Sequence, residues 1–358
     1  MKPTTNTRTK KYTYFIGVDI SRNELDFAVC QENTFLFHAE IKNEKDAILE
    51  FVGRLKAIPA FKLFKAVFCM ENTGFYGNHL LHVLVKIKAS IVNEHPLKIK
   101  NSIRMARGKD DKTDAIRIAE YAWKNRTELE LWSPKRAVIN ELAELMALRS
   151  RLLNVAMVLK TPQKEKKAFM NTKVYSKMAG ICEASIDAIS TDLMNLEQVI
   201  KNVISGDENL SKLMKIITSV PYIGFVTGTY ILIYTNEYKD ITDPKKFACY
   251  AGIAPFPKES GLLVRRRRLS SMANKRMKSL LHICAAAAAT RNAELNVYYK
   301  RKLEEGKPKL AVINAVRYKL VLRVFACLKQ DRLFIKKYER DQTNSNDYPS
   351  EVIITETI

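Results

Sequence analysis

YFIGVDI, residues 14–20, and KAVFCME, residues 65–71, are two short apolar runs that each carry an acidic residue at or next to their end. Runs of this length that are rich in β-branched and aromatic residues predict buried β-strands. The same kind of run recurs as ELDFAVC at 24–30, TFLFHAEI at 34–41 and ASIVNE at 89–94.

Apolar residues at helical spacing follow the third and fourth of these strands, at 45–58 and 77–87. Three consecutive strands are thus followed by alternating helices and strands. This order predicts an α/β layered domain.

The rest of the chain reads as mostly helical. Residues 138–160 and 186–204 repeat apolar positions every three or four residues, which predicts a long helical hairpin that serves as a spacer or a dimerisation arm. VPYIG at 220–224 predicts a turn between two helices, and APFPKESG at 254–261 predicts a loop. We expect one helix over 272–306, ended by Gly306, and another over 310–330.

The predicted organisation is therefore α/β plus all-α. It comprises a first domain at 1–130, a coiled-coil helical region at 131–213, a mostly helical third domain at 214–335 and a polar tail at 336–358.

Composition favours a polyanionic partner. The 358 residues carry 60 Lys and Arg against 38 Asp and Glu, a formal net charge of +22. A basic surface binds nucleic acid by releasing counterions, and an anionic membrane surface would attract the same charge. No apolar stretch reaches the ~20 residues of a membrane span, and residues 1–14 lack an apolar signal core.

The cysteines and histidines predict no zinc site. Six cysteines are scattered singly through apolar context without a Cys-x-x-Cys pair, which indicates reduced thiols in a cytoplasm. His79 and His82 are three residues apart but have no third ligand nearby, so we interpret them as surface or packing residues.

Four carboxylates carry the functional hypothesis. Asp19 and Glu71 each close a strand, while Asp111 and Asp114 stand three apart at the start of a helix. Asp110 and Asp114 would share a helical face almost equally well. Singly, a strand-end Asp is common in turns, and acids in a first helical turn favour the helix dipole. As a set they can hold two Mg²⁺ ions beside a phosphate.

Positive charge lies next to this cluster in the sequence, where a phosphate-rich substrate would seek it, although a merely solvated face would look the same. The residues concerned are Lys98, Lys100, Arg104, Arg107, Lys109 and Lys112.

These motifs, in their order and spacing, resemble the DEDD transposases of bacterial insertion sequences, over nearly the whole chain. The family includes bridge-RNA-guided recombinases and is similar to a group of site-specific DNA invertases. The resemblance is carried by GVDIS (17–21), ENTG (71–74), DKTDA (111–115), VPYIG (220–224), FACYAGIAP (247–255), ESG (259–261) and the basic segment that follows.

The resemblance implies a RuvC-like ribonuclease H fold for the first domain, with metal-binding acids, Mg²⁺ or Mn²⁺, at Asp19, Glu71, Asp111 and Asp114. It selects Asp111 over Asp110. It also implies a catalytic serine in the last domain, at Ser260. The residues alone favour a turn role for Ser260, since Ser-Gly is common turn chemistry and no His stands nearby as a base.

The densest basic segment follows this serine and suits the phosphates of DNA or RNA. It comprises Arg265, Arg266, Arg267, Arg268, Lys275, Arg276 and Lys278. VPYIG is similar to a helix-hairpin-helix turn, but Tyr222 replaces its usual first glycine, which weakens the case for a phosphate contact there.

The resemblance further implies a bacterial cytoplasmic enzyme, associated with the nucleoid when active, that recombines donor and target DNA. A structured guide RNA and assembly as a homodimer or tetramer are also expected. Two rivals stand beside this reading: a noncatalytic nucleic-acid scaffold, and an actin-like or sugar-kinase ATPase on the same core. An ATPase of this kind needs Gly-rich phosphate loops, and the sequence, with only 12 glycines, shows none.

Overall fold

The computed structural model describes residues 12–335 apart from 73, 103–109, 167–168, 255, 261–262 and 269–272. Along 162–166, 256–260 and 263–268 it describes the backbone alone. The chain forms two compact units, Met1–Pro134 and Lys135–Ile358. The finer division of the second unit near residue 213 stays a prediction.

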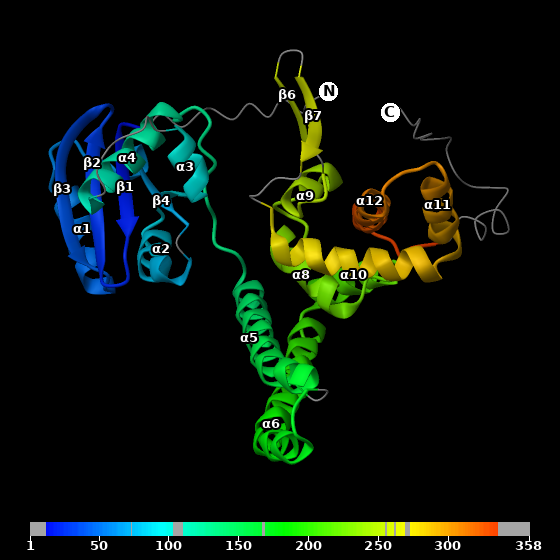
Figure 1. The fold of residues 1–358 in the computed structure, drawn as a ribbon. Helices are drawn as coiled ribbons and strands as arrows, with labels where there is room; N and C mark the ends of the chain where they lie inside the picture. Colours follow the sequence, from blue (N-terminus) through cyan, green and yellow to red (C-terminus); the bar gives the residue numbers. More distant parts are fainter. Residues whose placement is uncertain are drawn as a thin grey trace. The chain divides into compact units, whose positions relative to one another are not determined.

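The first unit is built on a five-stranded mixed sheet (Figure 1). Its strands are β1 (Tyr14–Ile20), β2 (Glu24–Gln31), β3 (Thr34–Lys42), β4 (Ala66–Glu71) and β5 (Ser90–Glu94), in the order β3-β2-β1-β4-β5. β2 is antiparallel to both β1 and β3, whereas β4 is parallel to both β1 and β5. The five predicted strands and the α/β class are confirmed.

Each face of this sheet has its own apolar core, because successive side chains of a strand point to opposite faces. Ile16, Val18 and Phe68 pack on the side of α1 (Lys45–Lys56) and α2 (Asn78–Lys86). Phe15 and Cys69 pack on the side of α3 (Pro96–Ser102) and α4 (Asp111–Lys124). Short 3₁₀ turns, η1 (Leu63–Lys65) and η2 (Gly74–Gly77), precede and follow β4. The sheet is thus covered by helices on both faces.

The second unit is helical. The predicted hairpin is present as α5 (Ala137–Lys166) and α6 (Thr172–Ser205), which lie side by side (Figure 1). The other helices are α7 (Glu208–Ser219), α8 (Phe225–Thr235), α9 (Pro244–Tyr250), α10 (Lys275–Arg291), α11 (Ala293–Glu304) and α12 (Lys309–Lys329). The base of the hairpin belongs to the same core as these helices, through residues such as Leu142 and Ile200.

Two predictions for the second unit, one of a helix and one of a loop, were wrong. The single helix expected over 272–306 is broken at Asn292, whose extended backbone ends α10 and whose side chain accepts a hydrogen bond from Leu295 N at 3.0 Å as the N-cap of α11. An Asn inside an apolar pattern competes with the helix in this way. Gly306, with φ +76°, does follow the end of α11, as the helix-terminating role of glycine predicts.

The segment expected as a loop is a strand. β6 (Phe256–Ser260) pairs antiparallel with β7 (Leu263–Arg268) in a two-stranded ribbon. The two prolines of APFPKESG suggested a loop, but an edge strand of a ribbon tolerates a proline because one of its sides is not hydrogen-bonded.

VPYIG is indeed the turn between α7 and α8, and Tyr222 adopts φ +71°, the left-handed region in which glycine is usual.

Among the described helices, none is long and apolar enough to cross a membrane.

Candidate active site

The two strand-end acids come to one edge of the first unit's sheet because their strands are parallel neighbours. Val18 of β1 is in register with Met70 of β4, and Asp19 and Glu71 are the next residues along each strand. Both then share the sheet face that carries Gly17 and Cys69, the face covered by α4. The sequence interpretation of a strand-end pair is therefore compatible with the geometry.

Helix α4 reaches this edge because it packs unusually close to β1. A Cβ added to Gly17 would lie 2.1 Å from the carbonyl oxygen of Ala115 and 2.4 Å from the amide nitrogen of Ala119. Real Cβ atoms do not approach backbone so closely, so only glycine permits this contact. The approach sets the first turn of α4, with Asp111 and Asp114, over the strand that carries Asp19 two residues after Gly17.

Each of the four acids acts electrostatically on Asp19 or Glu71, or is one of these two residues. The pKa of Asp19 is raised from 3.8 to about 6, first by burial and then by the charges of Asp111, Asp114 and Asp26. The pKa of Glu71 is also raised, by burial and by the charges of Asp19 and Asp114. Like charges held together in partial burial disfavour ionisation. The cluster therefore carries repulsion that a bound cation would relieve.

The donor set fits a hard divalent cation, since carboxylate oxygens are the ligands that Mg²⁺ and Mn²⁺ prefer. Among the described residues, no three His, Cys, Asp or Glu side chains are already close enough to hold one ion. Arg117 pairs with Asp114 at 2.6 Å, which neutralises part of one carboxylate. Ion binding would require the four carboxylates to come closer together.

Asp110, the alternative to Asp111, has a different place. It is the N-cap residue of α4, accepts a hydrogen bond from the Thr113 hydroxyl at 3.2 Å, and is not among the charges that raise the pKa of Asp19. The geometry thus favours the Asp111–Asp114 pair that the resemblance selects.

A fifth acid, missed in the sequence, stands beside the cluster. Asp26 of β2 is directly opposite Asp19 in the β1–β2 register, is 6% exposed, and binds His38 Nε2 at 2.7 Å. The available signal was an acid at an inward position of the strand ELDFAVC, where a carboxylate needs a partner.

A sixth acid at this edge is already neutralised. Glu94 closes β5 opposite Glu71, and it accepts hydrogen bonds from Lys98 at 2.7 Å and from the Tyr121 hydroxyl at 3.0 Å. Burial alone would raise the pKa of Glu94, but the bonds from Lys98, the His95 amide and Tyr121 lower it. Lys98, expected beside the substrate, is thus engaged by Glu94.

The predicted basic residues are distributed unevenly. Lys112 and Lys275 are exposed, Lys278 is half-buried, and the half-buried Arg276 lies over the ring of Tyr230 at 5.5 Å. The backbone of 265–268 is the second part of β7. Arg104, Arg107 and Lys109 lie outside the described residues.

Ser260 is the last residue of β6 and pairs with Leu263 across the ribbon. Its side chain lies outside the described atoms. It belongs to the second compact unit, whereas the four acids belong to the first. The proposed serine and the carboxylates are therefore supplied by different units of the chain.

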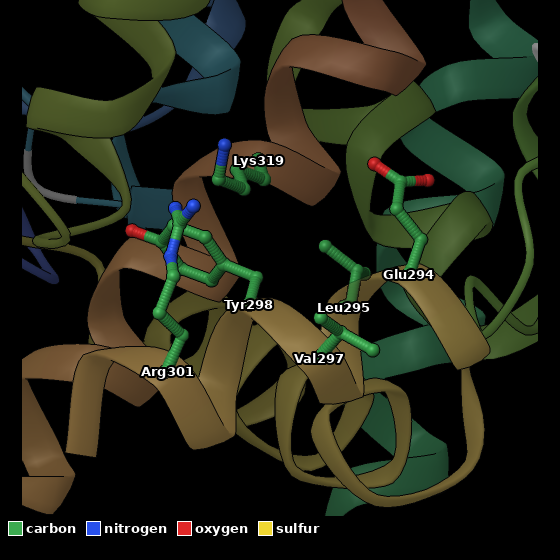
Figure 2. Close-up of a pocket in the computed structure, with 6 residues that line it drawn as sticks. All are labelled: Glu294, Leu295, Val297, Tyr298, Arg301 and Lys319. Carbon is green, nitrogen blue, oxygen red and sulfur yellow. The ribbon is translucent and has the colours of Figure 1, made fainter. Parts of the chain in front are cut away.

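A pocket of about 240 Å³ in the second unit adds a basic site that the sequence did not suggest (Figure 2). Lys319 of α12 lies 4.5 Å from the ring centroid of Tyr298 on α11, and the Arg301 guanidinium lies 5.7 Å from it. Leu295 lines the pocket, and Glu294, also in its lining, pairs with Arg323 at 2.5 Å. Lys319 and Arg301 are thus both held beside the Tyr298 ring by cation–π contacts, and Arg301 also pairs with Glu305 at 3.7 Å.

Comparison with known proteins shows which family the chain belongs to. A family described as DEDD transposases of the IS110 type matches residues 16–162, and the transposase family IS116/IS110/IS902 matches residues 214–300. These matches together span more than half of the chain, and the first includes all four acids.

Full-length relatives are also found. The pilin gene-inverting proteins of Moraxella lacunata and Moraxella bovis are each 26% identical over 329 residues, 90% of this chain and 98% of theirs. A 44.8 kDa protein of insertion element IS116 from Streptomyces clavuligerus is 28% identical over 120 residues, 34% of this chain and 30% of its own. The two matched regions and these relatives agree: the chain belongs to the IS110-type family of DEDD transposases.

Proposed function

We propose that this chain cuts and rejoins DNA strands for the movement or inversion of a DNA segment, with Asp19, Glu71, Asp111 and Asp114 as metal ligands and Ser260 as nucleophile. Membership of a transposase family supports DNA recombination and transposition as the activity. The observation that carries the site is that Asp19 and Glu71 end two neighbouring parallel strands, β1 and β4. The charges of Asp111 and Asp114 on α4 act on Asp19 as well, and together with burial, the largest cause, they raise its pKa to about 6.

The fold supports this site. The β3-β2-β1-β4-β5 order, with a three-stranded antiparallel part and a parallel β1–β4 pair, is compatible with a RuvC-like ribonuclease H fold. DEDD transposases typically use divalent ions, and Mg²⁺ or Mn²⁺ bound here would supply charge stabilisation at the reacting phosphate. Asp19, Glu71, Asp111 and Asp114 would hold such an ion, and the ion pair with Arg117 would orient Asp114.

The serine step is a transesterification. The Ser260 oxygen forms a bond to a DNA phosphorus, the phosphorus–oxygen bond to one flanking sugar breaks, and the hydroxyl proton ends on the departing sugar oxygen. The phosphodiester is thereby replaced by a phosphoserine ester, so the reverse attack by a sugar hydroxyl rejoins a strand without ATP. The two units, or two copies of the chain, would bring Ser260 and the acids together.

The net charge of +22 supports binding of donor and target DNA, and of a guide RNA such as a bridge RNA. Lys319 and Arg301, at the Tyr298 pocket, add two cations to the predicted basic residues. The exposed apolar side chains of the α5–α6 hairpin, Val158 among them, support assembly as a dimer or tetramer.

The test uses the full chain and DNA that carries the joined ends of its own element. Ser260→Ala should abolish strand exchange and covalent protein–DNA adducts while DNA affinity stays within about twofold; Asp114→Asn should abolish the metal-dependent reaction. Ser279→Ala is the matched control, because within the described part of the chain its hydroxyl donates to the Lys275 carbonyl of its own helix, α10. Adducts that persist in Ser260→Ala would remove this serine from the mechanism, and full activity in a chelator would remove the metal.

If the protein is instead a noncatalytic scaffold, substitutions of Ser260 and Asp114 should not differ from wild type in recombination assays. Only substitutions of basic residues should then weaken nucleic-acid binding. Sequencing of the RNA that copurifies with the protein tests whether it binds a guide RNA. A discrete structured RNA supports it, and a random RNA population contradicts it.

A further inference from the structure

Two aromatic rings are left on the surface immediately after the strand that carries Glu71. Phe75 and Tyr76 lie in η2, with 67% and 37% of their area exposed. Their ring centroids are 4.3 Å apart. Single exposed apolar residues are common, but two touching rings in one short turn form a patch with faces available for stacking.

This aromatic pair stands at the same edge of the sheet as the acids. Phe75 follows Glu71 by four residues, so their Cα atoms are at most ~14 Å apart. The turn also packs beside the end of β1, since a Cβ on Gly77 would lie 3.4 Å from Cδ1 of Ile20, the residue after Asp19. The pair therefore lies at the sheet edge where Asp19 and Glu71 end their strands. The Ile20 contact is on the α1–α2 face of the sheet, whereas the two acids share the α4 face, so a strand bound to both would pass over this edge.

The backbone beneath the rings is held in place. The side-chain amide of Asn43, which is 8% exposed, donates to the carbonyl of Ser21 at 3.0 Å and to the carbonyl of Tyr76 at 2.9 Å. One buried amide thus ties η2 to the chain that leaves β1. Gly74, at φ +79°, starts the turn in a conformation that other residues rarely adopt. Rings on a fixed turn lose little conformational entropy when a ligand covers them.

The chemistry of the patch matches a nucleobase. Aromatic side chains bind bases by stacking, which is tolerant of sequence because every base has a π face. At the ~3.4 Å rise of a stacked strand, the span of at most ~14 Å corresponds to about four nucleotides. A DNA strand whose phosphate lies at the acids can therefore reach the rings with a base only a few positions away. The chain's membership of a DNA-recombining family and its charge of +22 favour this ligand over an apolar peptide.

We propose that Phe75 and Tyr76 form a stacking platform that holds an unpaired base of the DNA strand a few nucleotides from the phosphate at the carboxylate cluster. This inference rests on the proposed function and deepens it, because it assigns the substrate class as DNA that is locally unpaired beside the cleavage position. A base stacked on the rings leaves its own helix, at a cost that is lowest where the strand is already open. The platform fixes which phosphate faces the acids.

The experiment measures binding in an Asp114→Asn background, so that no cleavage is needed and a failure of the proposed chemistry cannot mimic a failure of the platform. The ligands are a fully paired duplex and the same duplex with a short unpaired bubble that carries 2-aminopurine. Phe75→Ala and Phe75→Leu should each weaken bubble binding roughly 5- to 150-fold, as the loss of one stacking contact implies, and leave duplex binding nearly unchanged. Wild type should quench the fluorescence of 2-aminopurine at one position of the bubble, where the base stacks on the rings. Phe75→Trp should keep both this quenching and the affinity of wild type.

Phe64→Ala is the matched control, since Phe64 is 60% exposed on η1, at the opposite end of β4. The proposal is overturned if Phe75→Ala and Phe64→Ala bind the bubble equally well, or if Phe75→Leu binds as wild type does. It is also overturned if Phe75→Ala changes the sedimentation behaviour of the protein alone without changing the quenching, since the rings would then contact another protein chain.

Discussion

Gly17 in β1 and Ala115 in α4 are in backbone contact: a Cβ on Gly17 would lie only 2.1 Å from the Ala115 carbonyl oxygen. Strand and helix therefore touch without any side chain between them at this point. Because Asp19 follows Gly17 by two residues and Asp114 precedes Ala115, this one contact fixes the separation of acids from two distant parts of the sequence.

Gly17→Ala should consequently impair both stability and activity. The methyl group has to push α4 off the sheet, and overpacking of this kind costs about 1–3 kcal/mol or more. A displacement of ~1 Å at the acids should slow strand cleavage roughly 100-fold at temperatures where the variant is folded. Urea unfolding and single-turnover cleavage measure the two effects.

The control for this variant is Gly53→Ala in α1, where an added Cβ meets no atom within 4 Å. This change should stabilise the protein by about 0.5–1 kcal/mol, the helix preference of alanine over glycine, and leave cleavage unchanged. Equal behaviour of the two variants would show that the Gly17 contact does not matter.

Asp19→Asn should stabilise the metal-free protein while abolishing its reaction. The raised pKa of Asp19, about 6, means that the charged form is disfavoured in the fold by burial and by Asp111 and Asp114. Removing that charge should raise the free energy of unfolding by something on the order of 1–3 kcal/mol at pH 8. Thermal melts with and without Mg²⁺ test this: Mg²⁺ should raise the Tm of wild type and much less that of the variant. A variant less stable than metal-free wild type would contradict the repulsion.

Arg136→Ala should destabilise the second unit. Its guanidinium donates to Glu237 at 2.9 and 2.5 Å and to Asp207 at 2.8 and 3.0 Å, and the Glu237 side chain is fully buried. Loss of the main partner of a buried carboxylate costs about 3–5 kcal/mol, reduced here because Arg136 is 41% exposed and Lys239 still pairs with Glu237. We expect a loss of about 2 kcal/mol or more. Lys212→Ala, which breaks the exposed pair with Asp331, should cost no more than about 1 kcal/mol.

The same network predicts how stability depends on pH. Burial would raise the pKa of Glu237, but the bonds from Arg136, Lys239 and Asn209 lower it, and the bonds from Arg136 lower that of Asp207. A folded pKa below the unfolded value stabilises the protein above the unfolded pKa, about 4, and that contribution is lost as the pH falls further. The second unit should therefore lose stability below about pH 4.5, with a shallower loss in Arg136→Ala. Denaturant melts from pH 3 to 7 measure the slopes, and identical slopes would exclude the network as the cause.

Part of the fold could be predicted from the sequence, because short local patterns of apolar residues determine where strands and helices form. Five short apolar runs predicted the five strands of the first unit, helical spacing predicted α1 and α2, and the Asp-x-x-Asp pattern predicted the start of α4. The short helix α3 was not predicted. The local pattern failed in two places. Asn292 splits a predicted helix because its side chain caps α11, and the proline-containing segment at 256–260 forms a strand because a ribbon edge tolerates proline.

The sequence by itself determined which residue types are available: strand-end acids, an Asp-x-x-Asp helix start, a serine before a run of arginines, and a large positive charge. Only the tertiary structure decided which of these share a place. It brings Asp19 and Asp114 into electrostatic range through the Gly17 contact, neutralises Glu94 with Lys98, and leaves Phe75 exposed in the turn that follows β4. The physical reason is that proximity between distant segments depends on strand register and on how closely a helix can approach a sheet, and neither is encoded within a single short window of sequence.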